Sequence, residues 1–281
     1  MLEWIRRHPV LSYCLMVLLP VHLVLWPLRL GGVSVETLEL LTVPMGFLPT
    51  ASAVIVTLIV EGPAGVRQLF LRVWRPRPAF LWIALSLTLF LMLAVLAMTG
   101  RYLYSGISPL AAYWTIYGRL EFLLLLPVVL LLPGISEEFG WRGFMQTRLQ
   151  RQVPGGVACF LVGLTWSGWH AMDFLVDSWP NGPGYWAGFT AYVTGGSMLI
   201  GWLFTRSGGN VGIAILAHFG ANFVAIYTSV WDLYDGRPVS AFLFVGLIWL
   251  VSLLVVWLDP RMRRAEPDGM SERLEPGEDL P

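Results

Sequence analysis

Three short polar motifs with the residue types needed for hydrolytic chemistry occur in or beside apolar stretches of this sequence. EEFGWR, at residues 137–142, follows the apolar run 122–133, while WSGWH occupies residues 166–170 and HFGAN residues 218–222. Ionisable side chains inside a membrane are costly and usually face the bundle interior or a water-filled cavity. The three motifs together therefore indicate a functional site.

Helix geometry separates the two adjacent glutamates. With about 100° of rotation per residue, Glu138 and Arg142 lie on one face and can form an ion pair, whereas Glu137 points about 100° away and has no cation on its own helix. An unpaired carboxylate in a low-dielectric site holds its proton more tightly than one in water. Such a group suits general acid or base catalysis near neutral pH. We predict that Glu137 is reactive and that Glu138 and Arg142 orient the site.

The other two motifs repeat the four-residue spacing. Trp166 and His170 share a helix face, and so do His218 and Asn222. Glu137 together with His170 could hold and activate a water molecule. The side-chain N–H groups of His218 and Asn222 could stabilise a developing oxyanion. These functions combine in the hydrolysis of a peptide bond by an activated water.

Each of these residues also has a structural interpretation. The glutamates and the arginine could form an ion-pair network, and His218 and Asn222 could make interhelical hydrogen bonds. Trp166 and Trp169 are expected to serve packing, and His22 to be a satisfied core residue. The occurrence of three polar pairs on three separate predicted helices favours the functional interpretation.

The composition is typical of a membrane protein. The 281 residues are 56% hydrophobic and 13% charged, whereas soluble domains carry about 25% charged residues. A membrane span needs about 20 mostly apolar residues. We therefore expect an all-α, polytopic bundle of about eight transmembrane helices in a single domain, residues 1–264, followed by a disordered acidic cytoplasmic tail at 265–281. The predicted spans are 9–28, 38–60, 80–99, 119–136, 154–173, 185–205, 211–229 and 241–258.

The arginines predict the orientation in the membrane. All 18 basic residues are arginines, and with eight spans fourteen of them fall on the side of the termini and four on the other. The positive-inside rule then places both termini in the cytoplasm, most simply at the plasma (inner) membrane. The spans 185–205 and 211–229 are rich in glycine, which predicts close helix packing. The net charge of zero gives no basic footprint for nucleic acid.

The order of the motifs resembles the CPBP family, which comprises CAAX proteases and bacteriocin-processing or immunity proteins (the Abi family) and includes the Ras-converting CAAX endopeptidase. The resemblance covers about residues 134–223 and extends to a core of about 119–229. One departure is Trp166, where the family often has phenylalanine. The matching motifs are EExxxR, aromatic-xxxH and HxxxN, here Glu137, Glu138, Arg142, Trp166, His170, His218 and Asn222.

The resemblance implies an eight-helix intramembrane endopeptidase that cleaves near the cytoplasmic membrane face. It gives water activation to Glu137 and His170 and the oxyanion site to His218 and Asn222, and it makes Glu138 and Arg142 orienting residues. The implied partners are a peptide or protein substrate, lipidated or membrane-embedded in a CAAX-type reaction, and membrane lipid.

Zinc chemistry is an alternative mechanism. Glu137, His170 and His218 would make a ligand set of two histidines and one carboxylate. No HExxH sequence occurs, however, and Asn222 is a poor zinc ligand. We therefore favour a glutamate mechanism without a cofactor.

Two other functions compete with proteolysis. The first is a non-catalytic bacteriocin-immunity or regulatory membrane protein that keeps the motifs for structure. The second is a transporter in which Glu137 and His170 relay protons. The intact motifs favour the protease over the first, and the lack of an evident inverted repeat disfavours the second.

Overall fold

The computed structural model describes residues 1–74, 78–106, 131–172, 182–227 and 239–266, and within these ranges the chain is helical and contains no strand. Residues 131–138 are helical and continue into η2. The other elements are α1 (Leu2–Arg7), α2 (Pro9–Pro20), η1 (Val21–Leu25), α3 (Trp26–Leu30), α4 (Val35–Met45), α5 (Leu48–Leu71), α6 (Phe80–Ser105), η2 (Phe139–Gln146), α9 (Thr147–Leu149), α10 (Gly155–Trp169), η3 (His170–Met172), α12 (Gly182–Arg206), α13 (Val211–Tyr227), α14 (Val239–Leu258) and α15 (Pro260–Arg263).

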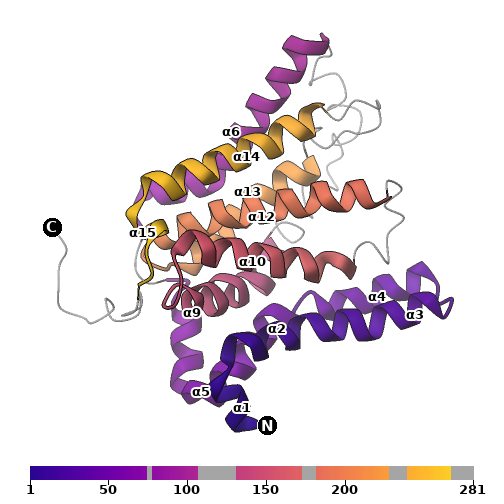
Figure 1. Cartoon of the computed structure of the whole chain (residues 1–281), viewed down its shortest axis with the longest axis vertical. Coiled ribbons are helices and arrows are strands. Elements are labelled where there is room, and N and C mark those ends of the chain that lie inside the picture. The colour runs from indigo at the N-terminus through magenta and orange to yellow at the C-terminus, as the bar shows by residue number, and fades with distance from the viewer. Residues whose placement is uncertain (75–77, 107–130, 173–181, 228–238, 267–281) are drawn as a thin grey trace.

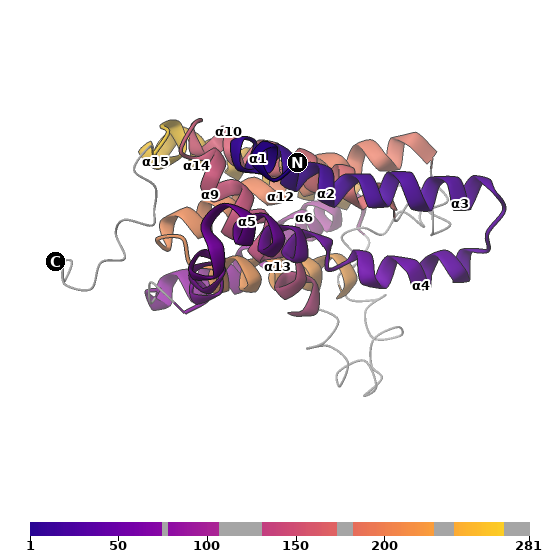
Figure 2. The same cartoon turned by 90° about the horizontal axis from the view of Figure 1, so that it is seen from below.

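The helices form a bundle around α12 and α13. Helix α12 packs against α10, α13 and α14, while α6 packs against α13 and α14. Figure 1 shows α10, α12 and α14 running side by side. Helices α3 and α4 form an elongated hairpin that extends from one end of the bundle, as Figure 2 shows from below. The predicted all-α bundle is therefore confirmed.

Four helical segments are long and apolar enough to cross a membrane: Pro9–Leu30, Val35–Leu71, Phe80–Ser105 and Val239–Leu258. Shorter apolar helices occur at Gly155–Trp169 and Val211–Ala225. Helices therefore occupy seven of the eight predicted spans. The remaining predicted span, 119–136, lies mostly outside the described residues, so the number of passes stays a prediction. Most of the predicted tail also lies outside them.

Two breaks interrupt the long segment that contains the second predicted span. Helix α4 ends at Met45 and α5 begins at Leu48, and Pro44, Gly46 and Pro49 lie at this break. A further kink lies within α5 at Gly62, whose φ is 71°. Proline and glycine of this kind are tolerated in membrane helices.

Close packing at two glycines confirms the predicted tight helix contacts of the span 185–205, which lies in α12. A Cβ on Gly195 would lie 2.8 Å from Ile248 Cγ2, and one on Gly201 would clash with Cys159 Sγ and lie 2.7 Å from Gln146 Oε1. Small residues of this kind let membrane helices approach each other. They bring α12 against α14, α10 and η2, which surround the polar motifs.

The segment that carries the first motif changes helix type at the motif itself. Residues 131–138 are α-helical, and Phe139–Gln146 form the π-helix η2. A Cβ on Gly140 would lie 2.5 Å from Tyr13 Oη and would clash with the carbonyl of Pro49, so η2 lies directly against α5. Turns of π-helix are frequent at functional sites. Here the turn begins just after the two glutamates.

Candidate active site

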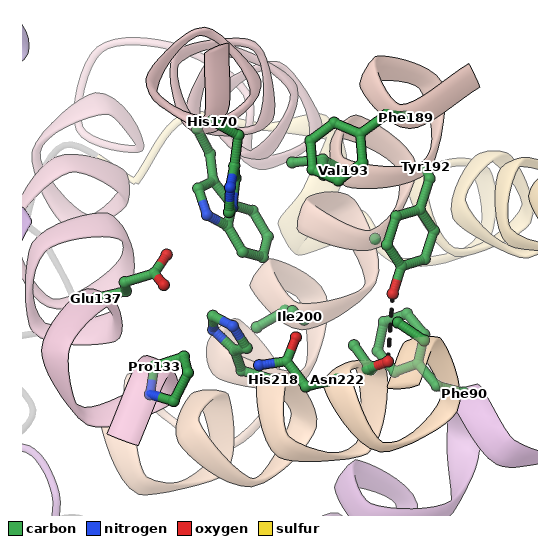
Figure 3. A pocket seen from close by; sticks show the side chains of 14 residues that line it. Phe90, Pro133, Glu137, His170, Phe189, Tyr192, Val193, Ile200, His218 and Asn222 are labelled. Atoms are coloured by element: carbon green, nitrogen blue, oxygen red, sulfur yellow. Dashed lines mark hydrogen bonds between the residues drawn. The ribbon is translucent and has the colours of Figure 1, made fainter. Parts of the chain in front are cut away.

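The predicted reactive residues line one pocket with a volume of about 370 Å³ (Figure 3). Glu137 comes from the helix that leads into η2, His170 begins η3, and His218 and Asn222 lie on α13. The remaining wall is almost entirely apolar and aromatic, and consists of Phe90, Pro133, Trp166, Phe189, Tyr192, Val193, Gly196, Ile200, Ala221 and Ala225. Three segments of the chain thus bring polar groups together in apolar surroundings.

Glu137 is buried, with 4% of its surface exposed. Its Oε2 accepts a hydrogen bond from the indole Nε1 of Trp141 at 3.1 Å. In Figure 3 its carboxylate points into the space between His170 and His218. The group is thus held through one oxygen by a neutral donor and faces both histidines.

Glu138 has different partners. It is fully buried, and its Oε1 accepts hydrogen bonds from Arg142 Nη1 and from His218 Nδ1, each at 2.7 Å. The predicted ion pair with Arg142 is therefore present. The contact with His218 also joins the first motif to the third across 80 residues of sequence.

Arg142 is enclosed on several sides. It is fully buried, and its Nη2 donates to Ser197 Oγ at 3.1 Å. Its guanidinium carbon lies 5.0 Å from the ring centroid of Trp166, which is cation–π geometry. Ser197 Oγ in turn donates to the carbonyl of Cys159 at 3.0 Å. The buried charge pair is therefore tied to both α12 and α10.

His170 lies among aromatic rings where α10 ends. Its ring centroid is 5.8 Å from that of Trp166, 4.8 Å from Trp169 and 5.2 Å from Phe189. Just before it, the carbonyl of Gly168 accepts a hydrogen bond from His22 Nε2 at 3.2 Å. His22 thus has the hydrogen bond expected of a satisfied core residue, and it braces the turn that carries His170.

His218 and Asn222 share one face of α13, as their spacing predicts, and both line the pocket. Because a carboxylate oxygen can only accept, the bond to Glu138 assigns a proton to His218 Nδ1. Helix α13 is also fixed to α12, since Tyr192 Oη donates to the carbonyl of Ala221 at 3.3 Å (Figure 3). The imidazole therefore has a set orientation within the pocket.

Two contacts of the site were missed by the sequence reasoning. Trp141 lies four residues after Glu137, which is the same spacing as that of Glu138 and Arg142. The spacing that predicted the ion pair could therefore also have predicted the contact of Trp141 with Glu137. Ser197 has no local signal, because it reaches Arg142 from a different helix, 55 residues away.

The described residues contain no group of three or more His, Cys, Asp or Glu side chains placed to hold a metal ion. Glu137, His170 and His218 line the same pocket but do not form such a group in this structure. One ring nitrogen of His218 is already bonded to Glu138. An experiment with chelators decides between the two mechanisms.

Comparison with known families agrees with the motifs. A family model described as Type II CAAX prenyl endopeptidase Rce1-like matches residues 119–224, a range that includes all three motifs. No curated protein matches the chain. The predicted CPBP resemblance is thereby confirmed, and the Rce1-like CAAX proteases are a peptidase family. Together with the apolar helices, the match indicates an integral membrane peptidase.

Proposed function

We propose that this integral membrane protein, whose residues 119–224 match the Rce1-like CAAX endopeptidase family model, is an intramembrane endopeptidase that uses a glutamate-activated water. The main support is the meeting of Glu137, His170, His218 and Asn222 in one pocket with apolar walls. A peptidase without a covalent intermediate needs a base beside a water and donors for the oxyanion, and this set provides both.

In the proposed reaction Glu137 is the general base. Trp141 occupies its Oε2, which leaves Oε1 to accept a proton from a water molecule that His170 helps to hold. The water oxygen attacks the carbonyl carbon of the substrate, and the proton passes to Glu137. When the C–N bond breaks, the same proton goes to the leaving amine, so the base is regenerated.

His218 and Asn222 would bind the tetrahedral oxyanion. Asn222 offers the N–H groups of its amide. His218 already donates Nδ1–H to Glu138, so donation to the oxyanion from Nε2 would need a proton on that nitrogen as well. Arg142 forms an ion pair with the carboxylate of Glu138 and holds it in place. Glu138 and Arg142 therefore act as orienting residues in this proposal.

The proposed substrate is a CAAX-type C-terminal peptide that carries a lipid and approaches from the cytoplasmic leaflet. The aromatic and aliphatic wall of the pocket suits apolar peptide side chains. The excess of arginine on one side of the predicted spans supports a cytoplasmic location for both termini. Eight spans and a site near the cytoplasmic face complete the proposed topology.

The test is cleavage by purified protein in detergent. The probes are a fluorogenic peptide that ends in S-farnesyl-Cys-Val-Ile-Met and the same peptide without the lipid. Glu137→Gln is compared with Glu39→Gln, an exposed glutamate on α4. We expect cleavage of the farnesylated probe to be lost only in Glu137→Gln, and to be unaffected by 1,10-phenanthroline.

The other outcomes are equally informative. Loss of cleavage on chelation, restored by added zinc, would replace the glutamate mechanism by the metal mechanism. Equal cleavage of both probes would remove the lipid from the proposed substrate. Folded wild-type protein that cleaves neither probe would overturn the CAAX endopeptidase proposal and favour the non-catalytic alternative.

A further inference from the structure

The Trp141 indole touches the reactive carboxylate directly. Its Nε1–H donates to Glu137 Oε2 at 3.1 Å, and among the described residues this is the only hydrogen bond to Glu137. Both side chains are buried. A carboxylate at the end of a flexible glutamate side chain can rotate unless a donor holds it. Trp141 supplies that donor from within the pocket's own helical segment.

The indole is itself held firmly. Its ring lies edge-on to Tyr13, with centroids 5.8 Å apart, and 6.2 Å from Trp169. Trp169 in turn lies 4.8 Å from His170. Next to it, Gly140 leaves no space for a side chain between η2 and α5. The aromatic residues therefore connect the orientation of Glu137 to that of His170 through packed rings.

A neutral donor has a chemical advantage over a cation here. An adjacent positive charge favours the ionised carboxylate strongly and makes it a weaker base, whereas one neutral N–H orients the group at a smaller cost in basicity. The only guanidinium of the motif goes to Glu138. Among the described residues, Glu137 accepts a hydrogen bond only from the neutral indole.

We propose that Trp141 is a positioning residue, which fixes Glu137 Oε2 so that Oε1 is presented to the attacking water. This inference rests on the proposed function. Removal of the N–H should therefore lower kcat and leave KM nearly unchanged, because the indole is buried and is not among the residues of the pocket wall. The loss of one neutral hydrogen bond of this kind corresponds to a fall of about tenfold in rate.

The test compares Trp141→Phe with Trp202→Phe in the full-length protein. Trp202 Nε1 also donates to a carboxylate, Asp259 Oδ2, at the same 3.1 Å, and it is not among the residues of the pocket wall. Both variants thus lose one indole–carboxylate bond and keep an aromatic ring. The measurements are kcat and KM for the farnesylated probe, together with the unfolding temperature.

We expect a fall of about tenfold in kcat for Trp141→Phe alone, with similar unfolding temperatures for the two variants. Equal kcat values for both variants and the wild type would overturn the positioning role. So would a rise in KM without a change in kcat. Glu137→Gln is assayed in parallel. If it keeps full activity, the proposed function fails; if it is inactive while Trp141→Phe is fully active, only the role of Trp141 fails.

Discussion

Removal of the Arg142 guanidinium should destabilise the protein more than any surface charge change. Arg142 and Glu138 are both fully buried, and their contact atoms are 2.7 Å apart. In Arg142→Met the carboxylate of Glu138 would stay buried without its cation. Breaking one partner of a buried pair costs about 3–5 kcal/mol. The loss of the hydrogen bond to Ser197 acts in the same direction.

The chain provides a matched control with the same spacing. Arg7 and Glu3 also form an i,i+4 ion pair, but their side chains are 71% and 76% exposed. Such pairs contribute about 0–1 kcal/mol, so Arg7→Met should change the stability very little. The measurement is the free energy of unfolding in mixed detergent and SDS micelles.

A double variant separates the charge from the packing. Glu138→Leu combined with Arg142→Met removes both buried charges, so it should be clearly more stable than Arg142→Met alone. It should nevertheless be inactive, because His218 loses its partner. The reasoning is refuted if Arg142→Met is no less stable than Arg7→Met, or if the double variant is as unstable as the single one.

Two further predictions concern the packing around the site. Gly140→Ala should destabilise the protein by about 1–3 kcal/mol, because the new methyl group would clash with Pro49 and Tyr13. The control is Gly188→Ala, whose Cβ would have no atom within 4 Å. It should be neutral or stabilising in the same unfolding assay. Ser197→Ala removes a hydrogen bond to the charged Arg142 and should lower the free energy of unfolding by about 1.5–3 kcal/mol. Ser252→Ala loses only a hydrogen bond to the carbonyl of Gly195 and should lower it by less. Equal losses of stability in the two variants would contradict this explanation.

The helices and the ion pair of Glu138 with Arg142 could be predicted from the sequence because they depend on short-range periodicity. Apolar runs of membrane length gave the positions of seven helical segments, and the four-residue spacing gave the contact of Glu138 with Arg142. The spacing also placed Trp166 beside His170. These features need no knowledge of how the helices pack against each other.

The contacts between helices could not be predicted in the same way. Glu138 bonds to His218 and Arg142 to Ser197 across 80 and 55 residues, and helix periodicity gives only the face on which a residue lies. The π-helix at Phe139–Gln146 was also missed. Its hydrogen bonding departs from the α-helical pattern on which the periodicity argument depends.

The different partners of the two glutamates support the separate functions that we propose for these adjacent acids. Glu138 shares its Oε1 between a guanidinium and an imidazole, so its negative charge is well compensated and it can hold both groups in place. Glu137 accepts a hydrogen bond from the neutral indole of Trp141 and has no guanidinium partner among the described residues. If Arg142 paired with Glu137 instead, the proposed base would have a cation beside it and His218 would face an uncompensated Glu138. A rotation of about 100° between neighbouring residues is enough to give the two carboxylates these different surroundings.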